Sequence, residues 1–458
     1  MEGAAGHRDS PPSSLTIPLI LSSENDTDKK PEHFDAKGYS NANHLHHHQI
    51  LLHHHHYSAT DGGGGEGTTT FFNTCFNGLN ALSGVGILST PYALASGGWL
   101  SLIFLMVIAG ATFYAGLLIK RCMEEDSSIR TYPDIGDRAF GRKGRLVVSV
   151  FMNVELYLVA TGFLILEGDN LVNLFPDMAI EIAGFHLGGR QSFVILVALI
   201  ILPSVWLDNL SLLSYVSASG VLASAIILAS IFWTGAFEGV GFRHTGTPLN
   251  LGGIPTAVSL YAFCYCAHPV FPTLYTSMKN KQQFSNVLLL CFILCTFCYA
   301  SMAVLGYMMF GPHVQSQITL DLPTNKFSAK LAIYTTLVNP VAKYALMVTP
   351  IVNVAKKRFR AYCNKRPFSM FISTAFVIST VIVALALPFF GELMSLVGAF
   401  LSVTASIILP CGCYLKISGS YRRFSLETVL LWGIVVLGVI IVVFGTYISL
   451  VQILHQLL

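Results

Sequence analysis

Charged side chains are scarce in this chain. Asp, Glu, Lys and Arg make up 11% of its 458 residues, whereas hydrophobic residues make up 53%. Soluble domains carry about 25% charged residues, so the low charge excludes an ordinary soluble domain. Long, nearly uncharged runs recur from residue 71 to the C-terminus. Such runs predict an all-α polytopic membrane protein.

Other features are also missing. Residues 1–69 are polar, so we expect no cleavable signal peptide. None of the ten cysteines falls in a predicted exoplasmic loop, so no disulfide framework is indicated. Cys295 and Cys298 have CxxC spacing but lie inside a hydrophobic run, where packing explains them better than redox or zinc chemistry. No nucleophile or metal cluster marks the membrane edge, so we expect neither an enzyme nor a cofactor or bound metal.

Apolar windows of about 20 residues, the length that crosses a bilayer, occur eleven times. The predicted spans cover residues 71–95, 98–121, 145–168, 192–207, 211–236, 253–276, 286–310, 329–355, 368–389, 391–415 and 425–454. The fourth window is short, and almost no gap separates the ninth from the tenth. The two predicted regions are therefore a tail, residues 1–69, and a transmembrane region, residues 70–458.

The distribution of Lys and Arg among the loops predicts the orientation. With the N-terminus in the cytosol, eighteen of these residues lie in cytosolic connections, and the opposite side holds only Arg190, Arg243, Lys326 and Lys330. This asymmetry follows the positive-inside rule. The net charge of +3 therefore reflects topology, and we expect contact with lipid but no nucleic-acid partner.

The N-terminal tail is rich in Ser, Asn, Asp, Gly and His and has few aromatic residues. Such a segment cannot bury enough apolar surface to fold, so we expect a disordered cytosolic tail. Residues 44–56 contain eight histidines. A biased tail without a ligand is the simpler interpretation, and metal binding or titration near neutral pH is the alternative.

The first hydrophobic run contains helix-breaking residues in its middle. Gly78, Gly84, Gly86 and Pro91 all fall within residues 77–93, although Gly costs about 1 kcal/mol and Pro about 3 kcal/mol in a helix interior. Irregular backbone at membrane depth is tolerated only where it lines a cavity or is buried in protein. The run therefore predicts a broken helix, which in transporters marks the binding site.

A second break is predicted five spans later. His268, Pro269 and Pro272 interrupt the sixth run, and this span enters from the side opposite to the first. Two antiparallel breaks at this spacing are what a 5+5 inverted repeat requires, with the eleventh span as an addition.

The two breaks together predict a ligand with two charges. The N-terminal ends of half-helices carry free N–H groups that suit a carboxylate, and the C-terminal ends carry carbonyls that suit an ammonium group or a cation. A zwitterionic amino acid fits both. The candidate substrate-binding residues are Asn80, Ser83, Gly84, Val85, Gly86, Phe263, Cys264 and Tyr265. Helix packing by the small polar residues and by the aromatic residues is the alternative explanation.

Five motifs along the chain are similar to those of one transporter family. They are residues 83–93 (SGVGILSTPYA), 131–136 (TYPDIG) with 139–141 (AFG), 164–170 (LILEGDN), 268–272 (HPVFP) with 275–278 (YTSM), and 306–311 (GYMMFG). Over about residues 68–455 the chain resembles the amino acid/auxin permease family, and within it a plant-like member of the vacuolar amino acid transporter branch. The resemblance implies a LeuT-like fold and proton-driven secondary transport of amino acids. That branch usually has Gly-His-Ala or Gly-His-Gly in span six, whereas Ala267 and Pro269 flank His268 here.

Three ionisable residues lie deep in the predicted spans: Glu155, His268 and Lys343. Such groups cost about 3 kcal/mol or more at membrane depth, so each is a candidate for proton coupling. A structural ion pair between Glu155 and Lys343 is the main alternative. Glu167 and Asp169 lie at the exoplasmic end of span three, where we expect them to cap the helix or line a vestibule.

The two breaks predict an amino acid transporter, and the family resemblance implies that it is proton-coupled and lies in an endomembrane, that of the vacuole. The alternatives are a plasma-membrane importer of amino acids or of an auxin-like weak acid, and an amino acid sensor without net flux. Eleven spans with two breaks conflict with a seven-helix receptor. A channel would need repeated rings of polar residues along its pore, and the sequence does not indicate any.

Overall fold

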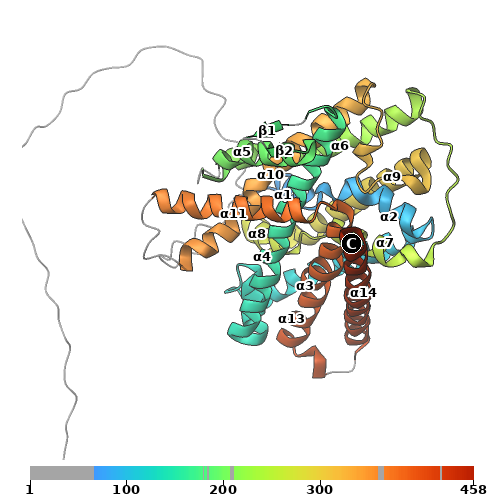
Figure 1. Cartoon of the computed structure of the whole chain (residues 1–458). Coiled ribbons are helices and arrows are strands. Elements are labelled where there is room, and N and C mark those ends of the chain that lie inside the picture. The colour runs from blue at the N-terminus through green and yellow to red at the C-terminus, as the bar shows by residue number, and fades with distance from the viewer. Residues whose placement is uncertain (1–66, 179, 183–184, 207–210, 359–365, 423–424) are drawn as a thin grey trace, which may run out of the picture. The chain divides into compact units, whose positions relative to one another are not determined.

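The computed structural model describes residues 67–178, 180–182, 185–206, 211–358, 366–422 and 425–458 (Figure 1). The histidine cluster at residues 44–56 lies outside these ranges, as does all of the tail up to residue 66. The expectation of a disordered cytosolic tail therefore stays a prediction.

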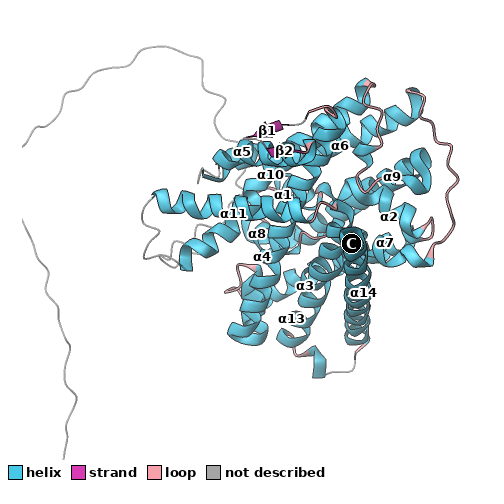
Figure 2. Cartoon of the chain, viewed as in Figure 1, coloured by secondary structure: helices cyan, strands magenta, loops and turns pink. Residues whose placement is uncertain are grey.

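Helices account for nearly all the regular structure (Figure 2). The long helices are α3 (Ser101–Glu125), α4 (Tyr132–Leu174), α5 (Gly189–Trp206), α6 (Ser211–Phe237), α9 (Phe284–Phe310), α10 (Phe327–Arg358), α11 (Arg366–Ala386) and α14 (Leu426–Leu457). The only strands in the described ranges are β1 (Ile180–Ile182) and β2 (Phe185–Leu187), which form an antiparallel hairpin between α4 and α5. Short helical turns join the rest: η2 (Leu251–Gly253), η4 (Lys281–Gln283), η5 (Gly311–His313), η6 (Ile318–Leu320) and η9 (Ser420–Arg422).

Ten helical segments of the described chain are long and apolar enough to cross a membrane. They are Ser101–Glu125, Tyr132–Leu174, Gly189–Trp206, Gly220–Phe237, Leu251–Ser277, Lys281–His313, Phe327–Lys356, Pro367–Ala386, Phe390–Ile417 and Leu426–Leu457. Each overlaps one of the eleven predicted windows. The window that has no counterpart is the first. The total of eleven membrane-spanning segments therefore stays a prediction.

The first hydrophobic run is a broken helix, as its glycines predict. α1 (Phe71–Leu82) ends at Ser83, which leaves helical geometry, and a 3₁₀ turn, η1 (Val85–Ser89), leads into α2 (Thr90–Gly97). Pro91 lies in the first turn of α2, where the missing N–H has no helical partner to lose. The proline therefore starts the second half of the span.

The sixth run is broken in the same manner. α7 (Ile254–Cys264) ends at Tyr265, the turn η3 (His268–Val270) follows, and α8 (Phe271–Ser277) completes the span. Pro269 and Pro272 each lie at the start of one of the two later elements. Both predicted interruptions are therefore confirmed, five spans apart.

Helix α4 is longer than the predicted window of 145–168. It starts with a capping box, in which the Asp134 carboxylate accepts from the Thr131 N–H at 2.8 Å. Gly141 then interrupts the helix with φ of 66°, a conformation that favours glycine. This interruption folds the first turns back, so that Gly136 and Gly144 meet with no room for a Cβ on either.

The tenth span contains two π-helical turns. α12 (Phe390–Leu396) continues through η7 (Val397–Ser402) and η8 (Thr404–Ile408) into α13 (Leu409–Ile417). Residues 387–389 separate it from α11, so the ninth and tenth runs are distinct helices. π-Helical turns are rare and frequently occur at functional sites.

The two broken helices lie at the centre of the packing. α1 packs against α6 and α9, while α7 packs against α2, α3 and η7. A Cβ on Gly398 of η7 would lie 2.0 Å from the Ser259 carbonyl of α7, so these backbones touch. Intact helices therefore surround both interruptions, as irregular backbone at membrane depth requires.

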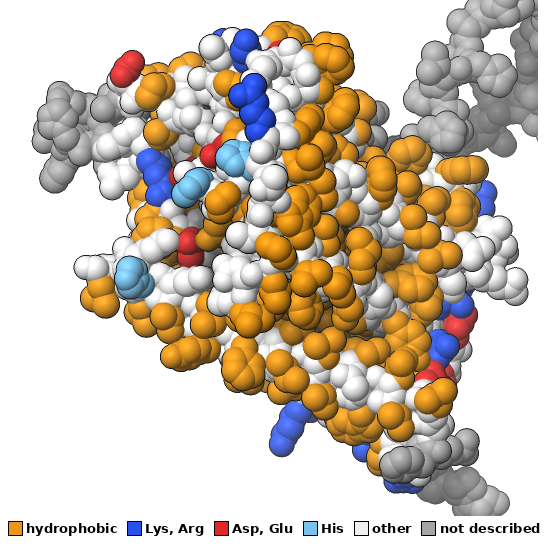
Figure 3. Space-filling view, turned by 90° about the vertical axis from the view of Figure 1, so that its right-hand side faces the viewer, with side chains coloured by type: hydrophobic (Ala, Val, Ile, Leu, Met, Phe, Trp, Pro, Cys, Tyr) orange, Lys and Arg blue, Asp and Glu red, His pale blue; other side chains and the backbone are white. Residues whose placement is uncertain are grey.

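Hydrophobic side chains cover much of the face shown in Figure 3. Large apolar residues are exposed on many helices, among them Leu199 on α5, Phe297 on α9 and Phe444 on α14. In a water-soluble monomer, apolar patches of this extent are rare. The surface is therefore that of a protein embedded in lipid.

A short bridge ties the start of the first broken helix to the end of the second. The Thr69 N–H donates to the Ser277 carbonyl at 2.9 Å, and the Thr69 carbonyl accepts from the Lys279 N–H at 3.0 Å. The Thr69 hydroxyl also donates to the Ser277 carbonyl at 2.7 Å. A Cβ on Gly67 would lie 2.0 Å from the Met278 carbonyl, so the chain before α1 lies directly against the end of α8.

This bridge predicts where the tail can be removed. Deletion of residues 1–60 leaves Gly67 and Thr69 in place and should leave the melting temperature in detergent unchanged. Deletion of residues 1–70 removes the bridge, whose hydrogen bonds contribute about 1 kcal/mol each. It should lower the melting temperature by about 2 to 4 °C or more. Equal melting temperatures for the two truncated chains would show that the bridge contributes nothing to stability.

Candidate functional site

A lysine from an intact helix holds the first break. The Lys343 ammonium, from the middle of α10, donates to the Ser83 carbonyl at 2.8 Å and to the Asn80 carbonyl at 3.4 Å. These carbonyls belong to the end of α1, where helical partners run out and partial negative charge accumulates. Lys343 is 5% exposed, so its charge acts almost entirely on this helix end.

Small residues of α6 complete the surroundings of the first break. The hydroxyls of Ser83 and Ser224 form a short hydrogen bond. A Cβ on Gly220 would lie 2.1 Å from the Asn80 amide oxygen and 3.2 Å from the Lys343 Nζ. The Asn80 amide oxygen is buried and has no hydrogen-bond partner among the described residues. Asn80 therefore keeps one acceptor available at the break.

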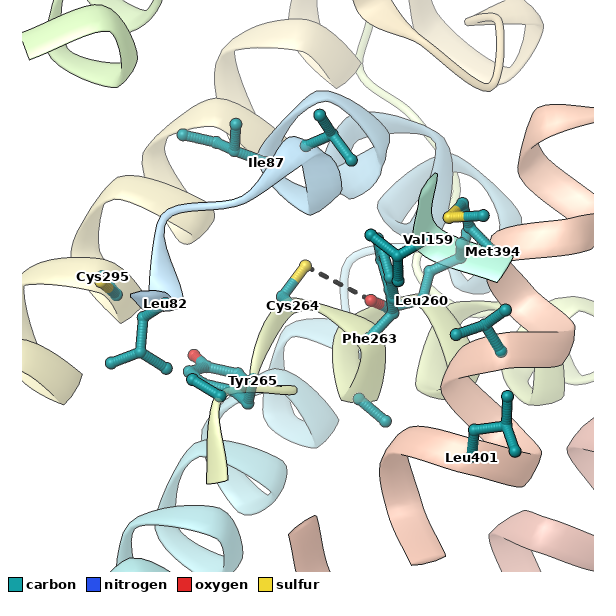
Figure 4. Close-up of a cluster of buried hydrophobic side chains, with 14 of the residues drawn as sticks. Leu82, Ile87, Val159, Leu260, Phe263, Cys264, Tyr265, Cys295, Met394 and Leu401 are labelled. Atoms are coloured by element: carbon teal, nitrogen blue, oxygen red, sulfur yellow. Dashed lines mark hydrogen bonds between the residues drawn. The ribbon is translucent and has the colours of Figure 1, made fainter. Parts of the chain in front are cut away.

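The two breaks meet at Gly86. A Cβ on Gly86 would lie 3.0 Å from the Cys264 Sγ and 3.3 Å from the nearest Phe263 ring atom. Figure 4 shows Phe263 and Cys264 at the end of α7, beneath the backbone that leads from Leu82 to Ile87. The Cys264 thiol donates to the Leu260 carbonyl at 3.3 Å. Three of the predicted site residues are therefore in contact.

Gly84 is placed differently. Its φ of −97° and ψ of −170° are extended values open to any residue, and a Cβ there would meet only the Leu82 carbonyl, at 4.0 Å. The backbone geometry at this position therefore does not require glycine. The missing side chain instead leaves open space within the break.

The aromatic residues before the second break have different surroundings. The Tyr265 hydroxyl bonds to that of Thr296 at 2.7 Å, and its ring stacks on Phe292. The Tyr261 hydroxyl bonds to that of Ser101 at 3.1 Å. Both tyrosines therefore pack against other helices, as the packing alternative expects, and Phe263 is the aromatic residue that contacts the first break.

His268 is fully buried at the second break. Its Nε2 donates to the Thr112 carbonyl of α3 at 2.8 Å, because a carbonyl can only accept. Its Nδ1 has no partner among the described residues. Nε2 therefore carries a proton, and Nδ1 makes no hydrogen bond within the described part of the chain.

Glu155 and Lys343 do not form an ion pair. The Glu155 carboxylate accepts from the Ser402 hydroxyl at 2.6 Å, whereas Lys343 is held by the carbonyls of α1, and no ion pair joins the two among the described residues. The pairing alternative is wrong in this structure. Ser402 ends the π-helical turn η7, and α4 also contacts η3, so Glu155 is associated with the second break.

The acidic residues at the far end of α4 lie near a hollow. Asp169 pairs with Arg190 at 2.7 Å and accepts from the Gln317 amide at 2.9 Å. Both members of this pair line a cavity of about 460 Å³, which also includes Tyr92 and Glu392. The vestibule expected for Asp169 is therefore present. Glu167 is buried, and one of its carboxylate oxygens has no partner among the described residues.

Two site residues were missed in the sequence. The Tyr299 hydroxyl of α9 lies 2.6 Å from the Leu82 carbonyl and 3.1 Å from the Cys264 carbonyl. Ser402 holds Glu155. A hydroxyl in an apolar span was the available signal for both. Serine hydroxyls in helices often bond to their own backbone, and with 18 tyrosines in the chain a single one does not stand out. Within the described ranges no cluster of His, Cys, Asp and Glu is placed to hold a metal ion.

Comparison with known proteins identifies the family. Residues 67–451 match the model of the family described as transmembrane amino acid transporter protein. The chain belongs to this family, the amino acid/auxin permease family. Two relatives from Arabidopsis thaliana are amino acid transporter AVT1J, 66% identical over 82% of this chain and 90% of its own, and amino acid transporter AVT1I, 63% identical over 83% and 94%. The expectation of a transporter rather than an enzyme is confirmed.

A solved structure with the same arrangement is the inward-facing conformation of Mhp1. It superimposes with a TM-score of 0.51 and 12% sequence identity, covering 85% of this chain and 92% of that one. This similarity shows that the chain has the LeuT-like fold that its two broken helices predicted.

The glycines of the first break give a direct test. Gly84→Leu fills open space, so uptake should fall at least about tenfold while abundance and melting temperature stay normal. Gly86→Ala forces Phe263 and Cys264 to shift. Such overpacking lowers the free energy of unfolding by about 1 to 3 kcal/mol, so this variant should have both a lower uptake and a lower melting temperature. Uptake of radiolabelled amino acids into liposomes measures the first effect, and thermal denaturation measures the second.

Gly110→Leu is the matched control, because Gly110 is an exposed glycine of α3 with no atom near its Cβ position. It should change neither quantity. Undiminished uptake by both Gly84→Leu and Gly86→Ala would remove these glycines from the binding site.

Proposed function

We propose that this protein is a secondary active transporter that moves amino acids across the vacuolar membrane and is driven by protons. The observation that carries the proposal is the contact between two broken helices at Gly86, Phe263 and Cys264. Family membership and the names of the Arabidopsis relatives support amino acids as the transported class.

The helix ends at the breaks suit a zwitterionic amino acid. The helical segment that begins at Val85 has no side-chain cap on its first N–H groups, so these groups are available to a carboxylate. Gly84 leaves space beside them. The unpartnered amide oxygen of Asn80 is an acceptor for the substrate ammonium group. Phe263 closes the other side and contacts the substrate side chain.

Proton coupling is supported by how the first break is stabilised. Backbone carbonyls at such a break coordinate sodium in sodium-coupled transporters. Here the Lys343 ammonium already occupies the Asn80 and Ser83 carbonyls. A cation built into the chain takes the place that a sodium ion would need, so protons are the better candidate for the coupling ion.

Glu155 is the proposed proton carrier. It is buried and held by one hydroxyl, and no cation pairs with it among the described residues. A carboxylate without a counter-ion in a low-dielectric site changes its protonation state when its surroundings change. Movement of η7 or of the second broken helix alters those surroundings directly.

The vacuolar location and the cytosolic N-terminus rest on the family resemblance and on the excess of Lys and Arg in the predicted cytosolic loops. A fluorescent fusion in plant cells tests the location. Signal at the plasma membrane instead of the vacuolar membrane would support the alternative of an importer.

Glu155→Gln tests proton coupling. Glutamine keeps the shape and can still accept from Ser402, but it cannot titrate. We expect purified Glu155→Gln protein in liposomes to exchange amino acid at about the parental rate while losing accumulation driven by an imposed pH gradient. The same assay, screened over the amino acids with sodium replaced by choline, identifies the substrates and should show no sodium requirement in the parent.

Lys343→Met and His268→Ala are the comparison variants. Lys343→Met should lose both exchange and accumulation, because the carbonyls of α1 lose their partner. His268→Ala should retain pH-driven accumulation. If Glu155→Gln accumulates amino acid as well as the parent does, Glu155 is structural. Absence of any flux in the parent would favour a sensor over a transporter.

A further inference from the structure

Tyr299 lies between the two broken helices. It belongs to α9 and is 1% exposed, and its hydroxyl lies 2.6 Å from the Leu82 carbonyl and 3.1 Å from the Cys264 carbonyl. Leu82 is the last residue of α1, and Cys264 is the last residue of α7. One side chain therefore contacts the C-terminal ends of both half-helices.

These two helix ends need a donor between them. The carbonyls at the end of a helix lack intrahelical partners and carry partial negative charge, so two such ends repel each other when they are close. The Leu82 carbonyl also accepts from the Gly84 N–H at 2.8 Å. Among the described residues, no hydrogen bond other than that of Tyr299 reaches the Cys264 carbonyl from outside α7.

The hydroxyl is shared between the two carbonyls. A phenol has one proton, which can take part in a three-centre hydrogen bond. The shorter distance makes the Leu82 carbonyl the stronger acceptor and the Cys264 carbonyl the weaker one. A single hydroxyl therefore joins the two half-helix ends in this structure.

Aromatic packing fixes the position of the ring. Tyr299 makes an edge contact with Tyr265, with ring centroids 5.5 Å apart, and Tyr265 in turn stacks on Phe292. Both Tyr299 and Phe292 belong to α9. The hydroxyl is thus aimed from α9, and the Tyr265 ring at the second break packs against the Tyr299 ring.

We propose that Tyr299 is a positioning residue for substrate binding: its hydroxyl holds the carbonyl ends of the two broken helices together, so that the groups around Gly84 and Phe263 face one substrate. This inference rests on the proposed transport function. It assigns to Tyr299 an effect on substrate affinity, not a contact with the substrate.

Tyr299→Phe tests the proposal, because it removes only the hydroxyl. Tyr344→Phe is the matched control, since Tyr344 is equally buried and its hydroxyl bonds to Thr380 at 2.5 Å, between α10 and α11. In proteoliposomes, Tyr299→Phe should raise the half-saturation concentration of the transported amino acid about tenfold. The maximal rate and the dependence on the pH gradient should change by less than about twofold.

Hydrogen–deuterium exchange on the purified proteins provides a reading that needs no transport. Tyr299→Phe should speed exchange of the backbone amides of residues 82–87 and 264–268 about tenfold, and Tyr344→Phe should leave them unchanged. Unchanged exchange in Tyr299→Phe, or a half-saturation concentration equal to that of Tyr344→Phe, overturns the proposal. If exchange speeds up as expected but the parent moves no amino acid, the tie stands and the transport function fails.

Discussion

The structure depends on one constraint: backbone groups released by breaking a helix at membrane depth must find partners within the protein. Two spans are broken here, between Leu82 and Val85 and between Cys264 and His268. In lipid, each unsatisfied group would cost several kcal/mol. The surrounding helices are therefore arranged to donate to those groups, and this arrangement also creates the site.

The partners come from intact helices and differ in chemistry between the two breaks. Lys343 of α10 places a full positive charge on the carbonyls at the end of α1. Tyr299 of α9 places a neutral hydroxyl between the ends of α1 and α7. Glu155 of α4 is joined through Ser402 to the π-helical turn beside α7. Movement of either broken helix must therefore change the surroundings of a buried polar group.

The breaks could be predicted from the sequence because local chemistry determines them. Gly84, Gly86 and Pro269 disfavour a continuous helix wherever they stand, and the matched spacing of the two breaks indicated the inverted repeat. Gly86, Phe263 and Cys264 then proved to be in contact. The partners could not be predicted in this way, since Tyr299 and Ser402 are ordinary residues whose importance arises only from which helix faces which.

The partners of Glu155 and Lys343 could not be predicted from the sequence either, and their positions bear on the proposed proton coupling. Opposite charges at similar depth suggested an ion pair, but helix packing directs each toward a different broken span. An ion pair would have made each charge neutralise the other, leaving little reason for either to titrate during transport. Separated, Lys343 remains a fixed cation that preserves the end of α1, and Glu155 remains a carboxylate without a counter-ion among the described residues. In the proposed function the substrate binds between the two breaks, so its effect on Glu155 passes through the ends of the broken helices. With Glu155 as the proposed proton carrier, proton binding acts back on the substrate by the same coupling free energy.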